Sequence, residues 1–269
     1  MTLAFIWYFN RASEIMPHWR DGLRAALEYL AKEHTVLWYL DEKVPQKHEV
    51  YDAILIWGDS NCPVLSYLST LPGKKGICLS TNPHNIENLK NVDAVFCEST
   101  VVYEEARRHG LRAVKAFGTD TDFFTPEKTK KDIEYFYPAT FSPWKRQGSI
   151  AKLGSKLLCL GTVQPDGEEE LEECRKKGVR VEVGYFPPEK IKEYYNRAQN
   201  IIIPAIHGSE RTVLEAMSMD ILPIVNPDNE KAHSYIKEYN SSGAYSPRDF
   251  VVDNYSHKDY AEQLLKGLQ

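Results

Sequence analysis

Residues 200–226 read NIIIPAIHGSERTVLEAMSMDILPIVN, a pattern of strand, loop, helix and second strand. The β-branched run 201–203 is typical of a strand that is buried on both faces. Pro204 and Gly208 interrupt the run, Ser209 is a suitable N-cap, and residues 211–219 are rich in helix formers. Residues 221–225 form the second apolar run. Such a unit belongs to an α/β fold with a parallel sheet.

The loop and first helical turn of this segment favour anion binding. Backbone N–H groups at a helix N-terminus lack helical acceptors, and the helix dipole adds a positive potential there. Glu215 lies in the second turn, on the same side as Arg211 and Thr212, where it can accept hydrogen bonds from vicinal hydroxyls such as those of a ribose. The alternative is structural, because parallel α/β domains contain many such units and a single helical Glu is usually solvated.

Short apolar runs alternate with helical patterns along the whole chain. This alternation predicts an α/β protein with two Rossmann-like parallel sheets and right-handed crossovers. The expected strands cover residues 2–9, 35–40, 51–57, 76–80, 92–97 and 112–116 in the first half, and 135–140, 156–161, 180–183, 201–203 and 221–225 in the second. Ligands of such sheets bind at the carboxyl ends of the strands.

A polar, charged segment at residues 118–131 separates the two halves and is interpreted as an interdomain linker. We therefore expect an N-terminal domain at 1–125, a C-terminal domain at 126–255 and a terminal helical segment at 256–269. Residues 240–243, Asn-Ser-Ser-Gly, are typical of a turn.

The composition is that of an ordinary globular protein. With 42% hydrophobic residues, 26% charged residues and a net charge of −5, nothing favours general binding to nucleic acid or an anionic membrane. The five cysteines show no CxxC spacing, so reduced thiols and no metal site are expected. The apolar N-terminus lacks a basic leader, and no run reaches the length of a membrane span. These features favour a cytoplasmic protein without a transmembrane segment.

Three segments resemble the GT-B glycosyltransferases of the retaining family 4 type. SERTVLEAMSMDILPIV, residues 209–225, is similar to the family's donor-binding segment. GTDTDFFTP, residues 118–126, is similar to the end of its first domain, and SPWKRQG, residues 142–148, to its phosphate-contacting loop. The resemblance implies two Rossmann-like domains that face a cleft, with the last helix crossing back to the first domain.

The resemblance places the donor, a nucleotide-diphosphate sugar, in the second domain. Glu215 occupies the position of the Glu that binds the nucleotide ribose, and Lys145 matches the family's phosphate-binding Lys. Arg146 is expected to substitute for the family Arg, whose position holds Thr140. The other expected donor contacts belong to the loop beside the base and to the start of the donor helix: Tyr185, Gly208, Ser209, Glu210, Arg211 and Thr212.

Two histidines are the catalytic candidates. Eight residues before Glu215, where the family has a Glu that contacts the donor sugar, this chain has His207. Pro83-His84-Asn85 resembles the family's element near the transferred sugar, although a single His such as His84 is more often structural. The loop after the first strand lacks the family's Gly pair and offers four candidate acceptor contacts: Arg11, Ser13, Glu14 and His18.

The function implied by the resemblance is retaining, metal-independent transfer of a sugar from a UDP- or GDP-linked donor, without a cofactor. The acceptor is left open. Because both halves are shorter than is usual in the family, an open cleft would suit a large acceptor such as a glycan, a glycoprotein or a modified nucleic acid. Two alternatives remain: a non-catalytic nucleotide-sugar or glycan-binding module, and a GT-B-like sugar-nucleotide epimerase.

Overall fold

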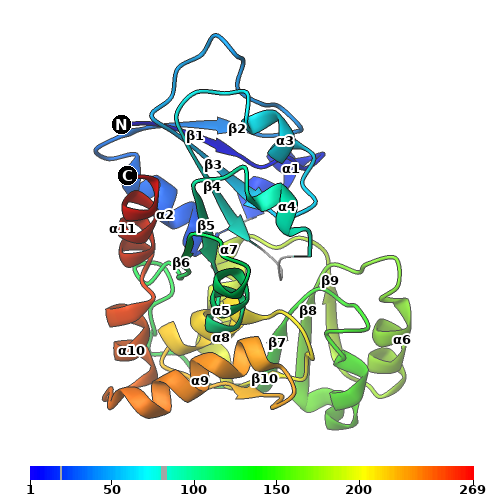
Figure 1. Cartoon of the computed structure of the whole chain (residues 1–269). Helices are drawn as coiled ribbons and strands as arrows, with labels where there is room; N and C mark the ends of the chain where they lie inside the picture. The colour runs from blue at the N-terminus through cyan, green and yellow to red at the C-terminus, as the bar shows by residue number, and fades with distance from the viewer. Residues whose placement is uncertain (19, 80–83) are drawn as a thin grey trace. The chain divides into compact units, whose positions relative to one another are not determined.

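The computed structural model of the chain describes residues 1–18, 20–79 and 84–269. The chain forms two compact units (Figure 1). Unit 1 comprises Met1–Gly118 and Ser256–Gln269, and unit 2 comprises Thr119–Tyr255. Each unit contains one parallel sheet with helices packed on it, so the prediction of two parallel α/β sheets is confirmed.

Unit 1 is built on a six-stranded parallel sheet with the order β2-β1-β3-β4-β5-β6. Its strands are β1 (Thr2–Ile6), β2 (Thr35–Tyr39), β3 (Ala53–Gly58), β4 (Lys74–Leu79), β5 (Ala94–Cys97) and β6 (Ala113–Lys115). β1 lies inside the sheet, because Phe5 pairs with Trp38 of β2 and with Leu55 of β3. The chain therefore winds away from β1 in both directions, and the carboxyl ends of all these strands meet at one edge.

Helices cover both faces of this sheet. They are α1 (Ala12–Ile15), the 3₁₀ helix η1 (Met16–His18), α2 (Gly22–Leu30), α3 (Val64–Leu68), α4 (Ile86–Leu89), α5 (Thr100–Arg108) and α11 (His257–Leu268). Successive side chains of a strand point to opposite faces. Leu3 and Phe5 accordingly pack with α2 and α11, whereas Ala4 and Ile6 pack with α3, α4 and α5. The two faces thus form separate apolar layers.

The ring of Phe96, in β5, is enclosed between two glycines of unit 1. A Cβ on Gly76 would stand 2.6 Å from the ring, and a Cβ on Gly267 would stand 2.4 Å from it. Neither distance is compatible with a side chain, so both positions require glycine. Because Gly267 belongs to α11, this close approach seats α11 against the sheet, and Leu264 and Leu268 complete the apolar layer there.

Unit 2 contains a five-stranded parallel sheet with the order β11-β10-β7-β8-β9. Its strands are β7 (Ile133–Pro138), β8 (Leu157–Gly161), β9 (Arg180–Val183), β10 (Ala198–Ile203) and β11 (Ile224–Val225). Ile201 and Ile203 are fully buried, as their β-branched run predicts. β7 and β10 are parallel neighbours, so the loops that follow them open on the same edge of the sheet.

The helices of unit 2 pack in groups on its sheet. They are the 3₁₀ segment η2 (Gln147–Lys156), α6 (Glu168–Lys176), α7 (Pro188–Arg197), α8 (Glu210–Ser218), α9 (Glu230–Ser242) and α10 (Pro247–Asn254). η2 contacts β8, and α6 contacts η2 and β9; α7 contacts β7 and β10, and α8 contacts α9 and α10. Thr119 N donates to Tyr255 O at 2.9 Å, so the chain enters and leaves unit 2 at neighbouring points.

Two helices of unit 2 differ from the sequence prediction. Residues 240–242, expected in a turn, complete α9, which ends at Gly243 with a φ of 71°. The hydroxyls of Ser241 and Ser242 donate back to carbonyls of α9, at 2.9 and 2.8 Å, so turn-forming residues are accommodated within the helix. α10 was not expected, although Ser246 caps it and Pro247 stands at its start. No helix in the described part of the chain has the length and apolar character needed to cross a bilayer.

Candidate functional site

Lys145 reaches from the loop after β7 to the loop after β10. Its Nζ lies 2.8 Å from Ser209 Oγ and 3.4 Å from the carbonyl oxygen of His207. The main chain joins the same two loops, because Ile206 N donates to Trp144 O at 2.9 Å. The structure therefore brings the basic loop and the start of α8 together and places an ammonium group between them.

Gly208 leaves the space that the Lys145 side chain occupies. Its φ is 72°, in the left-handed region, and a Cβ on it would stand 2.8 Å from Lys145 Nζ. On the carbonyl side, Asn229 Nδ2 donates to Gly208 O at 2.8 Å. Asn229 is 1% exposed and is also the N-cap of α9. The absence of a side chain at Gly208 and the buried amide of Asn229 thus fix the path of the loop beside the Lys145 ammonium.

Ser209 stands at the N-cap of α8 but does not cap it, so the predicted side-chain cap is wrong. An N-cap residue normally has extended backbone angles and turns its oxygen toward the first helical amides. Ser209 instead has a φ of 75° and makes no side-chain cap hydrogen bond. Its hydroxyl lies 3.2 Å from Tyr137 OH and accepts from Lys145. The serine oxygen is therefore committed to the cation.

Glu210 is a buried carboxylate at the first position of α8. It is 5% exposed, and Oε1 has no hydrogen-bond partner among the described residues. Oε2 lies 3.8 Å from the point where a Cβ on Gly208 would stand, and Lys145 Nζ lies 2.8 Å from the same point. The start of α8 thus combines a cation, a carboxylate and helix amides. This set can donate to an anionic group and accept from hydroxyls.

Glu215 is a buried acceptor in the second turn of α8. Its Oε2 accepts from Tyr195 OH at 2.9 Å, and its Oε1 pairs with Arg211 Nε at 3.4 Å. Burial raises the pKa of Tyr195 well above its ordinary value, and the adjacent carboxylate raises it further, so the phenol keeps its proton and donates it. At about 1.5 Å of helical rise per residue, Glu215 lies about 9 Å along the axis from Ser209.

The other predicted donor contacts of unit 2 differ in exposure. Thr212 is 6% exposed and donates from Oγ1 to Pro138 O at 3.4 Å. Arg146 is half-buried, and His207 is exposed at the loop that Lys145 reaches. Tyr185, in the loop after β9, is 58% exposed. The structure therefore places Lys145 against His207 and Ser209, with Glu215 six residues beyond Ser209 along α8.

The candidates of the first 90 residues belong to unit 1. Fully buried Ser60 accepts at Oγ from the backbone N–H groups of His84 and Asn85, both at 3.0 Å, and the His84 side chain is exposed. Pro83 lies outside the described residues. Ser60 thus fixes the backbone from which the imidazole projects.

The four acceptor candidates lie after β1, also in unit 1. Arg11 Nε donates to Glu14 Oε2 at 2.7 Å, and both side chains are exposed. Ser13 N donates to Asp41 Oδ1 at 2.9 Å, and His18 is exposed in η1. An acceptor bound by Arg11 or Glu14 would have to replace their mutual ion pair.

Sequence reasoning missed Tyr137, Tyr195 and Asn229. Asn229 directly precedes a helical pattern, which is an N-cap signal. Tyr137 lies within an apolar strand and Tyr195 within an amphipathic helix, where a tyrosine is usually a packing residue. Their hydroxyl partners, Ser209 and Glu215, lie 72 and 20 residues away in the sequence, and only the folded sheet brings them together.

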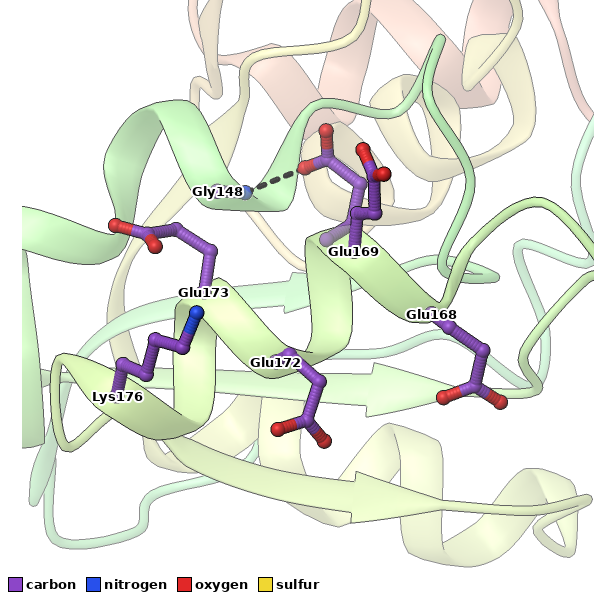
Figure 2. A pocket seen from close by; sticks show the side chains of 7 residues that line it. Gly148, Glu168, Glu169, Glu172, Glu173 and Lys176 are labelled. Carbon is purple, nitrogen blue, oxygen red and sulfur yellow. Dashed lines mark hydrogen bonds between the residues drawn. The ribbon is translucent and has the colours of Figure 1, made fainter.

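A hollow of about 600 Å³ lies over α6 in unit 2 (Figure 2). It is lined by Gly148, Glu168, Glu169, Glu170, Glu172, Glu173 and Lys176. The carboxylates point in different directions, and Glu170 accepts from Gly148 N at 2.6 Å. Such a lining repels a diphosphate. Within residues 1–18, 20–79 and 84–269, no group of three or more His, Cys, Asp or Glu is arranged to hold a metal ion.

No protein-family model matches the sequence, and neither does any curated protein. Solved structures, by contrast, resemble the chain over nearly its whole length. HepE of Anabaena, solved in complex with UDP and glucose, has a TM-score of 0.67 at 10% identity over 100% of this chain and 99% of its own. AviGT4, a glycosyltransferase involved in avilamycin A biosynthesis, has a TM-score of 0.66 at 13% identity over 100% of this chain and 97% of its own.

WaaG, a glycosyltransferase involved in lipopolysaccharide biosynthesis, has a TM-score of 0.56 at 14% identity, covering 99% of this chain and 90% of its own. Identities this low show the fold alone. The fold of the chain is accordingly GT-B, as the resemblance of residues 209–225 predicts.

Proposed function

We propose that this GT-B chain is a glycosyltransferase of the family 4 type that takes a sugar from a UDP- or GDP-linked donor. The observation that carries the proposal is the 2.8 Å contact between Lys145 Nζ and Ser209 Oγ, which sets a cation at the N-terminus of α8. The proposal is also supported by the structural neighbours, of which HepE was solved with UDP and glucose.

Unit 2 binds the donor in this proposal. The Lys145 ammonium and the first amides of α8 neutralise the diphosphate, with Arg146 as a further cation. Glu215 accepts from the ribose hydroxyls, since a carboxylate oxygen that accepts from Tyr195 has a second lone pair. Tyr185 flanks the base, while Ser209, Glu210, Arg211 and Thr212 lie around the phosphates and the sugar.

The reaction breaks the bond between the anomeric carbon and the diphosphate oxygen, and the nucleoside diphosphate leaves with the electron pair. A bond forms from that carbon to the oxygen of an acceptor hydroxyl, whose proton passes to the departing diphosphate or to solvent. Negative charge accumulates on the departing diphosphate, and preorganised cations stabilise that charge most where water is excluded. Because Lys145 and the helix amides supply positive potential, we propose a metal-independent transfer, with retention of configuration. His207 and His84 are proposed to contact the sugar, and the loop after β1 a large acceptor such as a glycan, glycoprotein or modified nucleic acid.

A non-catalytic nucleotide-sugar-binding module is the second candidate. His207 favours it, because an imidazole stands where the family has a carboxylate beside the donor sugar. The structure leaves the His207 side chain exposed, at the loop that Lys145 reaches. The residues that bind the donor would be the same in both functions. Only a measurement of sugar transfer to an acceptor separates the two.

The test measures melting temperature with UDP, GDP and their sugar conjugates, then product formation with the best donor and a panel of glycan acceptors. A ligand that binds only the folded chain raises its melting temperature. We expect Lys145→Ala and Glu215→Gln to lower turnover by about 10²–10³-fold. Lys152→Ala, which removes an exposed lysine of η2, is the matched control and should keep full activity.

Binding of a nucleotide sugar without any new glycosidic bond would support the binding module instead. Wild-type turnover by Lys145→Ala and Glu215→Gln would refute the assigned roles. Circular dichroism of each variant separates loss of function from loss of fold.

A further inference from the structure

Ser209 connects a buried tyrosine to the lysine of the proposed donor site. Its Oγ lies 2.8 Å from Lys145 Nζ and 3.2 Å from Tyr137 OH. Tyr137 is fully buried in β7, Lys145 follows β7, and Ser209 follows β10. The three polar atoms thus form a line from the core of unit 2 to the loop edge of its sheet.

The chemistry of the three groups decides which of them donates and which accepts in each hydrogen bond. An ammonium group can only donate, so Ser209 Oγ is the acceptor of the Lys145 contact. Burial raises the pKa of Tyr137 above its ordinary value, although the Ser209 hydrogen bond opposes the rise, so the phenol stays protonated. A neutral phenol hydroxyl and a serine hydroxyl can share one hydrogen in either direction, and both directions fix the position of Oγ.

The backbone of Ser209 indicates that this contact replaces a more ordinary one. A φ of 75° is uncommon outside glycine, and here it turns the hydroxyl away from the amides that an N-cap serine normally satisfies. The Ser209 hydroxyl makes no helix-capping hydrogen bond and instead accepts from Lys145. Asn229 holds the preceding carbonyl, of Gly208, so the arrangement is built from both sides.

We propose that Tyr137 and Ser209 are positioning residues that hold the Lys145 ammonium where the diphosphate of the donor binds. The inference rests on the proposed function, in which Lys145 contacts that diphosphate. A free lysine side chain occupies many rotamers, and a ligand that needs one of them binds more weakly. The two hydroxyls supply that order before the ligand arrives.

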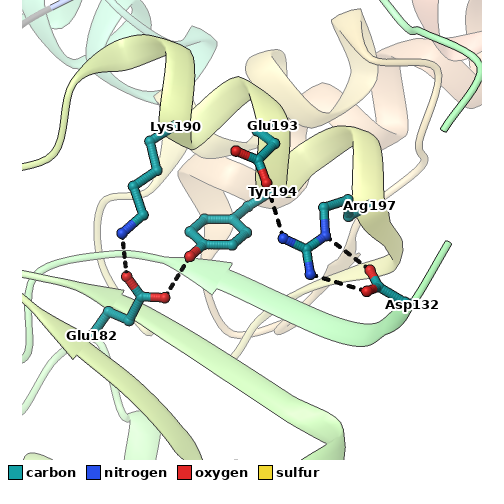
Figure 3. Close-up of polar contacts among 6 residues, drawn as sticks. All are labelled: Asp132, Glu182, Lys190, Glu193, Tyr194 and Arg197. Carbon is teal, nitrogen blue, oxygen red and sulfur yellow. Dashed lines mark hydrogen bonds and ion pairs between the residues drawn. The ribbon is translucent and has the colours of Figure 1, made fainter. Parts of the chain in front are cut away.

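The first experiment titrates UDP and GDP into the whole chain by calorimetry. Tyr137→Phe and Ser209→Ala each remove one hydroxyl, and we expect each to weaken nucleotide binding by about 2–10-fold. Tyr194→Phe is the matched control, since its hydroxyl donates to Glu182 of β9 at 2.5 Å (Figure 3), and this variant should bind nucleotide as the wild type does.

A double variant separates positioning from general damage to the unit. If Tyr137 acts through Ser209, then Tyr137→Phe has no further effect on affinity in the Ser209→Ala background. If the two residues instead had independent structural roles, the loss of affinity in the double variant would equal the product of the losses in the two single variants. The ammonium signal of ¹⁵N-labelled Lys145, assigned from its absence in Lys145→Met, adds a spectroscopic measure, because a hydrogen-bonded ammonium exchanges its protons slowly. We expect that signal to broaden in both single variants and not in Tyr194→Phe.

The outcomes divide clearly. Wild-type chain that binds neither UDP nor GDP overturns the proposed function and this inference with it. Wild-type chain that binds, with affinities and a Lys145 signal unchanged in Tyr137→Phe and Ser209→Ala, overturns the inference and leaves the function standing. Multiplicative losses in the double variant overturn it as well.

Discussion

The absence of a side chain at Gly208 leaves room for the Lys145 ammonium. A methyl group there would meet Lys145 Nζ at 2.8 Å, and its φ of 72° is strained for any other residue. We expect Gly208→Ala to displace the ammonium and weaken UDP binding, and to lower the free energy of unfolding by about 1–2 kcal/mol. UDP titration and urea unfolding measure the two effects separately.

Gly243 provides the matched control for this prediction. Its φ is 71°, but nothing lies within 4 Å of a Cβ built on it. Gly243→Ala therefore imposes the same backbone strain without displacing a side chain. It should lose similar stability and keep its UDP affinity, and an equal loss of affinity in both variants would show that strain alone is responsible.

Individual side chains differ in how far the sequence predicts them. The proposed roles of Lys145 and Glu215 come from the resemblance of residues 142–148 and 209–225 to the family 4 glycosyltransferases, and the structure places both in unit 2 beside other polar groups. The cap at Ser209 is predicted wrongly, because a serine before a helix indicates a cap only when no cation competes for its oxygen. Tyr137 gives no signal, since its partner is defined by the pairing of β7 with β10.

An ion pair joins the end of α7 to the start of β7 in unit 2 (Figure 3). Arg197 donates to both carboxylate oxygens of Asp132, at 2.9 and 3.0 Å, and to Glu193 at 2.9 Å. The Arg197 hydrogen bonds lower the pKa of Asp132 below its ordinary value of 3.8. A carboxyl whose pKa is lower when folded stabilises the fold above its unfolded pKa and stops doing so as the pH falls through its folded value.

Asp132→Asn should therefore lower the melting temperature at neutral pH and have no effect once the wild-type carboxyl is protonated. The loss should be small, because both side chains are partly exposed and water screens the pair. Melting curves of the two proteins over a series of pH values, from about 7 down to the lowest pH at which both fold, check this, and the difference should narrow as the pH falls. A gap that persists at the acidic pH would assign the effect to something other than the charge.

Strands and helices are predicted unevenly. The parallel strands follow from short apolar runs, because a strand buried on both faces leaves little choice of residue. α9 and α10 are harder, since their residues are largely polar and the helices are fixed by packing against α8 rather than by composition. The serines that end α9 satisfy helix carbonyls and so override their turn preference.

For the molecule as a whole, the position of α11 matters most. Residues 256–269 belong to unit 1, and Leu264 is fully buried in its core with Phe5 and Phe96. We expect Leu264→Ala to destabilise unit 1 by about 2–5 kcal/mol. Tryptophan fluorescence in urea reports this, because Trp7, Trp19, Trp38 and Trp57 all lie in the unit 1 part of the sequence.

Glu262→Ala is the control on the same helix. Glu262 lies 3.9 Å from Lys266 with both side chains about two-thirds exposed, so its loss should change the free energy of unfolding by less than about 0.5 kcal/mol. If both variants unfold at the same urea concentration, α11 contributes little to the core.

The two sheets are predicted from the alternation of strands and helices, which is a property of the whole sequence. The assignment of residues 256–269 to the first half is implied only by the family resemblance, since their local pattern shows only an amphipathic helix. It depends on the notch that Gly76 and Gly267 form around Phe96, and glycines 191 residues apart carry no local signal of their contact.

That notch also sets the order in which the chain can be completed during synthesis. Every residue of unit 2 leaves the ribosome before α11, which supplies Gly267 to the notch, does. Unit 2 is continuous and can close as it emerges, whereas one apolar face of the unit 1 sheet is covered by α2 but not yet by α11. The core of unit 1 is therefore completed only after unit 2 has been synthesised.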